Sequence, residues 1–144
     1  MNTFYKFDYS DFPNVKIMFK SDVVNSQVDE FFSEWLAIYD FNQDFNILFD
    51  VTQVKKPTFK MACKMIRFIR KLRKQIPQLF RNSFIICPNS TFMKFLFKFV
   101  FTLSKPVSRV YVYWNDHPEL DVNMDNVAEI FEANPEIFQY IANV

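Results

Sequence analysis

The chain has 144 residues, of which 50% are hydrophobic and 23% charged, a composition typical of one folded domain with its own core. It contains no glycine, which excludes the glycine-dependent phosphate loop, dinucleotide-binding loop, nucleophile elbow and EF-hand calcium loop. One histidine and two cysteines are too few for a Cys/His zinc site. The sequence therefore predicts a protein that binds rather than catalyses, with no metal and no cofactor.

The net charge of +1 conceals a strong segregation of charge along the chain. Residues 1–50 hold nine acids and three bases, residues 51–115 hold fourteen bases and no acid, and residues 116–144 hold seven acids and no base. An acid-free run of 65 residues indicates a basic face that meets an anionic partner, unless folding brings the acidic ends against it.

The first half of the chain predicts two strands, a helix and a third strand. Residues 4–9 alternate aromatic and polar side chains, and residues 15–19 follow across a turn-forming cluster, which favours a hairpin. After Ser26, apolar residues recur at spacings of three and four, which predicts an amphipathic helix ending near residues 40–42. Residues 45–52 form a short, almost continuously apolar run, typical of a central strand buried on both faces.

The second half continues the alternation of helices and strands. Residues 58–75 predict a helix that ends before Pro77, and Thr58 lies where its hydroxyl can cap the first turn. The further elements expected are a strand at residues 83–87, a helix at 92–103, a strand at 109–114, and one or two terminal helices at 126–133 and 135–141.

The helix predicted at residues 58–75 has two contrasting faces. Its apolar stripe, expected to pack in the core, consists of Met61, Met65, Phe68, Ile69 and Leu72. Its opposite, basic face consists of Lys60, Lys64, Arg67, Lys71 and Lys74.

The helix predicted at residues 92–103 is apolar nearly all round, so one small domain has difficulty burying every one of its rings. Lys94 and Lys98 lie on its polar stripe, and Phe97 and Phe101 are the rings expected at an interface. Together with the basic face, these four side chains define the expected partner or membrane surface. A core helix covered on both sides is the alternative interpretation.

The element order β-β-α-β-α-β-α-β-α predicts a single α/β domain over residues 1–144, with a mixed, mostly parallel sheet of about five strands. This order, with the runs FNILFDV, SFIIC, PNSTFMKFLFKFVFTLSKP and RVYVY, resembles the STAS domain of bacterial anti-sigma-factor antagonists. That resemblance implies a regulatory protein-interaction module. It also implies a phosphorylation switch at a helix N-terminus, where this chain has Thr58 as the only hydroxyl in place of the family's Asp-Ser-Ser-Gly.

Residues 45–114 also resemble, more weakly, the lipid-binding lobe of CRAL-TRIO proteins, in which an asparagine after a strand leads into an aromatic helix ending in Lys-Pro. This resemblance implies binding to lipid or to an anionic membrane surface. A protein partner or homo-oligomer is the leading hypothesis, lipid binding is the second, and nucleic-acid binding through the central basic block is the third.

Three further side-chain types have plain structural interpretations. Cys63 and Cys87 are expected to be reduced, buried thiols, and Asp50 to cap its strand end or pair with a lysine. His117 is expected in an exposed loop.

The N-terminus lacks the pattern of a secretory signal, and the longest apolar run is too short to span a bilayer. We therefore expect an intracellular protein, soluble or peripherally associated with a membrane.

Overall fold

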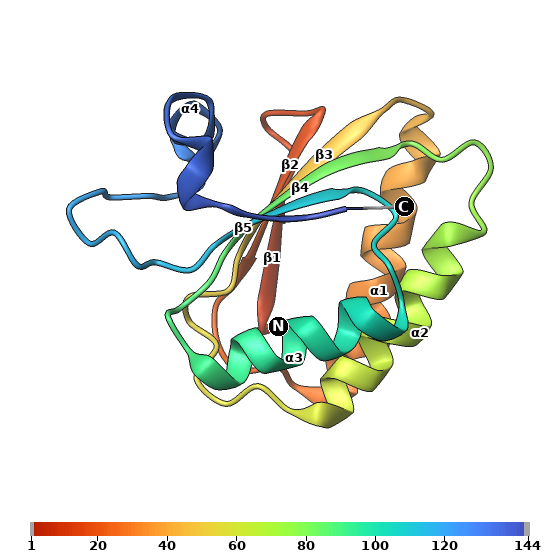
Figure 1. Cartoon of the computed structure of the whole chain (residues 1–144). Coiled ribbons are helices and arrows are strands. Elements are labelled where there is room, and N and C mark those ends of the chain that lie inside the picture. The colour runs from red at the N-terminus through yellow and green to blue at the C-terminus, as the bar shows by residue number, and fades with distance from the viewer. Residues whose placement is uncertain (1, 143–144) are drawn as a thin grey trace.

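The structure is a computed structural model that describes residues 2–142. A six-stranded sheet is covered by helices on both faces (Figure 1). The strands are β1 (Tyr5–Asp8), β2 (Asn14–Phe19), β3 (Phe45–Asp50), β4 (Phe80–Ile86), β5 (Arg109–Tyr113) and β6 (Gln139–Ile141). The α-helices are α1 (Val28–Ala37), α2 (Phe59–Arg73), α3 (Thr91–Leu103) and α4 (Val127–Ala133).

The strands lie in the sheet in the same order as in the chain, from β1 to β6. Strands β2 to β5 are parallel, whereas β1 and β6 pair antiparallel at the two edges. Each parallel connection passes through a helix, as expected for β-α-β units. The α/β class and the mixed sheet are therefore confirmed, with six strands instead of about five.

The central strands are buried on both faces because each face carries its own helical layer. Ile47 and Phe49 of β3 point into the main core beneath α1, α2 and α3, whereas Leu48 points into a second cluster beneath α4. All three side chains are buried, which confirms the two-sided strand predicted for this run. Figure 1 shows α4 on the side of the sheet opposite α1, α2 and α3.

Aromatic rings account for much of the main core. Phe31 of α1 is fully buried, and its ring contacts rings of the N-terminal hairpin region, including Phe4 and Phe19. Trp35, one turn later, packs against Phe49 at 5.1 Å between ring centroids. The N-terminal hairpin is thereby fixed to α1 and to the parallel sheet.

The C-terminal segment differs from the sequence prediction. The helix expected at residues 126–133 is α4, but residues 135–141 form a short 3-10 turn followed by strand β6. Trp114 Nε1 donates to Gln139 Oε1 at 2.7 Å, and the rings of Tyr111 and Tyr140 stack. Because these long-range contacts place β6 at the edge, the local sequence pattern could not reveal it.

We predict that Phe31→Ala lowers the free energy of unfolding by roughly 3–5 kcal/mol, because it empties a ring-sized volume in a closely packed core. Ile76→Ala is the control, since Ile76 is 94% exposed, and it should change stability by no more than about 0.5 kcal/mol. Urea unfolding followed by circular dichroism measures both. Equal effects of the two substitutions would contradict the packing described here.

Candidate functional site

Helices α2 and α3 both belong to the acid-free block of residues 51–115. They pack against each other on the outside of the molecule. Each begins with a hydroxyl cap: Thr58 Oγ1 accepts from the Met61 N–H, and Ser90 Oγ accepts from the Met93 N–H, both at 3.2 Å. The predicted capping role of Thr58 is confirmed. Thr58 is exposed beside Lys55, Lys56 and Lys60, and its phosphorylation stays a prediction.

Four rings meet where α2 and α3 begin, and we call them the aromatic patch: Phe59, Phe92, Phe95 and Phe99. Phe59 is the centre, with its ring 5.6–5.8 Å from each of the other three. Phe59, Phe92 and Phe95 are 47%, 42% and 50% exposed, and Phe99 is half-buried. Large apolar rings exposed as a group indicate a surface that contacts something other than water.

The structure places Phe97 and Phe101 differently from the expected interface. Both are half-buried, and Phe97 packs against Trp114 at 5.2 Å between ring centroids. Phe101 packs on Phe97 and beside the α2–α3 contact. The exposed rings of α3 are instead Phe92 and Phe95, whereas Met93, Leu96 and Val100 are buried. The spacing of three residues between Phe92 and Phe95 places them close together on the helix. The sequence could predict their exposure only if the buried face of the helix were already known.

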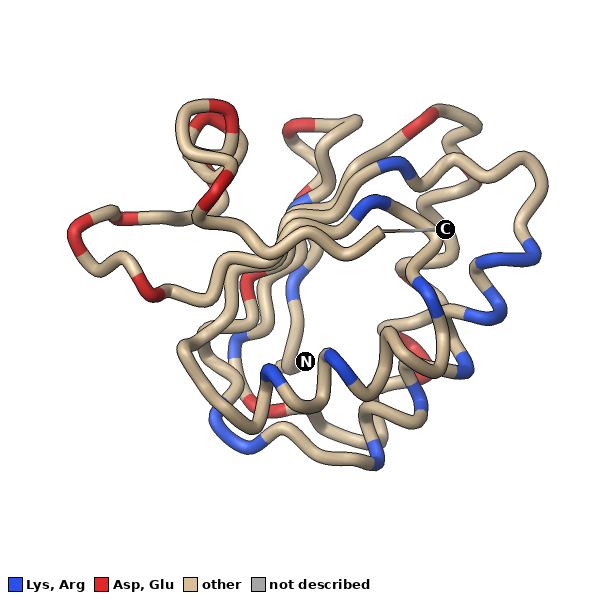
Figure 2. The backbone as a smooth tube through the Cα atoms, in the orientation of Figure 1, with Lys and Arg blue, Asp and Glu red and all other residues tan. Residues whose placement is uncertain are grey.

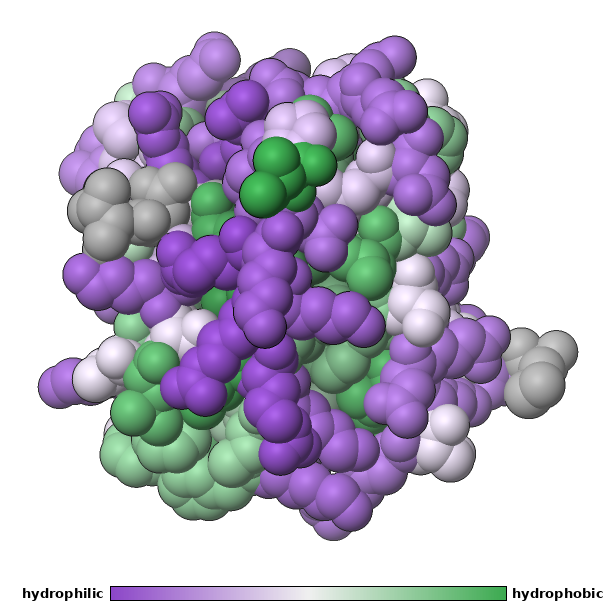
Figure 3. Space-filling view, turned by 90° about the vertical axis from the view of Figure 1, so that its right-hand side faces the viewer, coloured by the Kyte–Doolittle hydropathy of each residue, from purple (hydrophilic) through white to green (hydrophobic). Residues whose placement is uncertain are grey.

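The expected basic face of α2 is present on the surface, and we call it the basic ridge: Lys60, Lys64, Arg67, Lys71 and Lys74. Lys64 is half-buried and the other four are exposed. Lys64, Arg67 and Lys71 border a shallow groove against α1, to which Asp29 is the one acidic contributor. Figure 3 shows an apolar area beside a band of hydrophilic residues on the helical side of the molecule.

The two expected lysines of α3 are both exposed. Lys94 Nζ donates to Asn89 Oδ1 at 3.2 Å and lies 5.5 Å from the Trp114 ring centroid. On helical spacing, Lys98 lies between Lys94 and the exposed ring of Phe95. Lysines of α3 and the basic ridge of α2 therefore flank the aromatic patch on two sides.

The acids of the C-terminal block do not neutralise this surface. The C-terminal acids gather on α4 and the loop before it, across the sheet from α2 and α3 (Figure 2). Among these C-terminal acids, Asp125 forms an ion pair with Lys16 of β2, with 2.9 Å between Asp125 Oδ1 and Lys16 Nζ. Within residues 2–142, no base of α2 or α3 lies within 4 Å of a carboxylate oxygen. The C-terminal acids and the bases of α2 and α3 therefore lie on opposite sides of the sheet, whereas α1 brings Asp29 of the N-terminal block beside the basic ridge.

Asp50 and His117 have local roles. Asp50 accepts hydrogen bonds from the backbone N–H and the hydroxyl of Thr52, which confirms that it caps the end of β3. His117 lies in a loop with Asp116 and Glu119 within 4 Å, and its side chain is half-buried. Among residues 2–142, no group of three potential metal-ligating side chains is found.

Comparison with known proteins gave no matching family model, no similar curated protein and no similar solved structure. The resemblances to STAS and CRAL-TRIO domains therefore stay predictions. Over the described residues, no helix has both the length and the hydropathy needed to cross a bilayer.

The cysteines differ from each other, contrary to the expectation that both are buried. Cys63 is exposed on α2, whereas Cys87 is fully buried at the end of β4. Burial, aided by the negative charge of Asp50, raises the pKa of the Cys87 thiol well above its ordinary value, so the reactive thiolate is suppressed there.

We predict that N-ethylmaleimide adds once to the native protein, at Cys63, and twice in denaturant, as counted by mass spectrometry. The Cys63→Ser variant should gain no adduct while folded. Equal native rates at both thiols would show that Cys87 is not enclosed.

Proposed function

We propose that the chain is a peripheral binding module for anionic membrane surfaces, which docks through the outer face of α2 and α3. The observation that supports this most directly is the aromatic patch with bases on both sides and no ion-paired carboxylate. Lysine and arginine side chains attract anionic headgroups, while phenylalanine rings enter the boundary between headgroups and acyl chains. Neither the basic side chains nor the exposed rings alone would require a membrane. Their combination on one surface matches the headgroup and acyl-chain layers of an anionic membrane.

The basic side chains and the phenylalanine rings contribute comparable amounts to the free energy of membrane binding. A base near an anionic membrane surface contributes about 1 kcal/mol. Each apolar ring removed from water adds about 25 cal/mol per Å² buried, which amounts to 1 kcal/mol or more for a half-exposed phenylalanine. Several bases of the ridge with the three exposed rings of the patch are sufficient for reversible binding.

A protein partner is the alternative that the sequence favoured. Its expected contacts, Phe97 and Phe101, are half-buried, so the rings that α3 offers most openly to a partner are Phe92 and Phe95 of the aromatic patch. The bases around that patch form no ion pair among the described residues, which favours a broad anionic surface, because a protein partner would need a matching excess of carboxylates.

Vesicle flotation tests the proposal, with phosphatidylcholine vesicles that contain or lack phosphatidylserine. We expect the wild-type protein to float only with phosphatidylserine, and less at high salt because salt screens the attraction. Lys94→Glu/Lys98→Glu should weaken binding by more than about twentyfold, since two attractions of about 1 kcal/mol each become repulsions. Phe92→Ser/Phe95→Ser should also release the protein.

Matched variants control for net charge and for loss of apolar surface. Lys6→Glu/Lys20→Glu changes the charge equally on exposed lysines that, like Lys94 and Lys98, form no ion pair within the described part of the chain, and Phe41→Ser/Ile76→Ser removes exposed apolar side chains elsewhere. Both should float like the wild type. Absence of flotation, or equal losses in the control variants, would refute membrane docking. A lipid-independent complex that is lost in Phe92→Ser/Phe95→Ser would assign the patch to a protein partner.

A further inference from the structure

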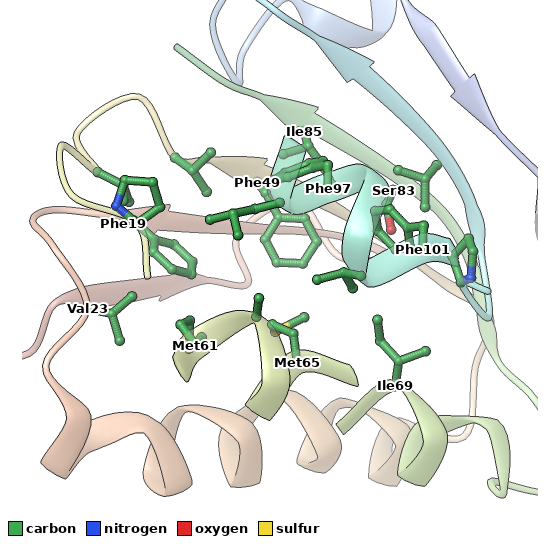
Figure 4. A pocket seen from close by; sticks show the side chains of 18 of the residues that line it. Phe19, Val23, Phe49, Met61, Met65, Ile69, Ser83, Ile85, Phe97 and Phe101 are labelled. Atoms are coloured by element: carbon green, nitrogen blue, oxygen red, sulfur yellow. The ribbon is translucent and has the colours of Figure 1, made fainter. Parts of the chain in front are cut away.

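A cavity of about 220 Å³ lies between the main face of the sheet and the helices α2 and α3. Figure 4 shows Met61, Met65 and Ile69 of α2 on one side and Phe49 and Ile85 of the sheet on the other. An engineered apolar cavity of roughly 150 Å³ already binds benzene, so this volume suits a larger apolar group.

The lining indicates an elongated occupant. On α2 it extends from Met61 to Leu72, eleven residues apart, which corresponds to about 16 Å along a helix. Figure 4 shows Phe19 and Val23 at one end and Ile69 and Phe101 at the other. A hydrocarbon chain fits this shape better than a compact ring system.

The interior of the cavity offers little to a polar ligand. Its buried hydroxyls, Ser83 and Ser108, are hydrogen-bonded to each other at 2.8 Å. Three methionines, Met61, Met65 and Met93, line it, and their flexible thioether side chains adapt to chains of different conformation.

The mouth of the cavity is polar, and Lys56 is the one charged side chain among the described residues that line it. The exposed residues of the lining are Asn25, Lys56 and Thr58, so the cavity opens where α1 and α2 begin. Asp22 Oδ1 accepts from the backbone N–H groups of Lys55 and Lys56 at 2.6 and 2.9 Å, which holds this rim in place and keeps the pKa of Asp22 below its ordinary value. The positive end of the α2 dipole adds to the Lys56 charge.

We infer that the cavity binds a single-chain anionic amphiphile of the fatty-acid type, with its chain between the sheet and α2–α3 and its carboxylate at Lys56. This goes beyond membrane docking, because Phe92, Phe95, Lys94 and Lys98 do not line the cavity. The two sites can therefore fail independently.

The five methionines of the described residues allow a test on the unmodified sequence. In protein labelled with ¹³C at the methionine methyls, laurate is titrated below its micelle concentration and without vesicles. The methyls of Met61, Met65 and Met93 should shift saturably at one laurate per chain. Met18 on the opposite face of β2 and Met124 in the second core cluster should not. No shift of the cavity methyls, or equal shifts of all five, would overturn the inference.

Two neighbouring lysines test the position of the carboxylate. Lys56→Glu should weaken laurate binding at least about tenfold, because an attraction at the mouth becomes a repulsion. The same variant should bind uncharged dodecanol as the wild type does. Lys55→Glu is the matched control, since Lys55 is equally exposed but does not line the cavity, and it should lose less than about threefold. Equal losses in the two variants would refute a carboxylate at Lys56.

A filled cavity should bind neither probe. Met65→Trp places a larger side chain in the cavity, and circular dichroism with a thermal melt verifies its fold. Retained laurate binding by folded Met65→Trp would show that the chain binds elsewhere.

Discussion

Connections between neighbouring parallel strands place α1, α2 and α3 together on one face of the sheet. Because β2 to β5 follow one another in sequence order, each helix lies beside the next, and α2 packs directly on α3. The acid-free block of the chain is thereby concentrated in two adjacent helices. Had the strand order reversed in mid-sheet, these helices would lie on opposite faces and no continuous basic and aromatic surface would form.

The sheet also separates the C-terminal acids from the bases of α2 and α3. The acidic C-terminal segment crosses to the opposite face as α4, where its apolar residues cover Leu48, Ile86 and Tyr113. Its carboxylates therefore lie across the sheet from the bases of α2 and α3 (Figure 2), and Asp125 pairs instead with Lys16 of β2. A nearly neutral protein thus carries, on its α2–α3 side, bases that form no ion pair in the part of the chain that the structure describes, the arrangement on which the proposed docking to an anionic surface rests.

Helices α2 and α3 use different faces for the two proposed interactions. Their outer face carries the aromatic patch and the basic ridge, whereas their inner faces line the cavity with Met61, Met65 and Phe97. Each of the two helices buries only part of its surface in the core. This explains why a chain with twenty phenylalanines leaves several rings exposed. An amphiphile in the cavity would pack against the same helices that we propose to dock on the membrane.

Local patterns determined much of this molecule: the alternation of strands and helices, the apolar β3, the basic face of α2 and the Thr58 cap all follow from periodicity and capping chemistry. The tertiary structure decided the rest. Strand β6 forms because residues 139–141 reach the free edge of β5, and no local signal encodes that edge. Likewise, helix α3 is apolar on nearly every side, so only its packing on α2 and Trp114 decides that Phe97 and Phe101 turn inward while Phe92 and Phe95 remain exposed.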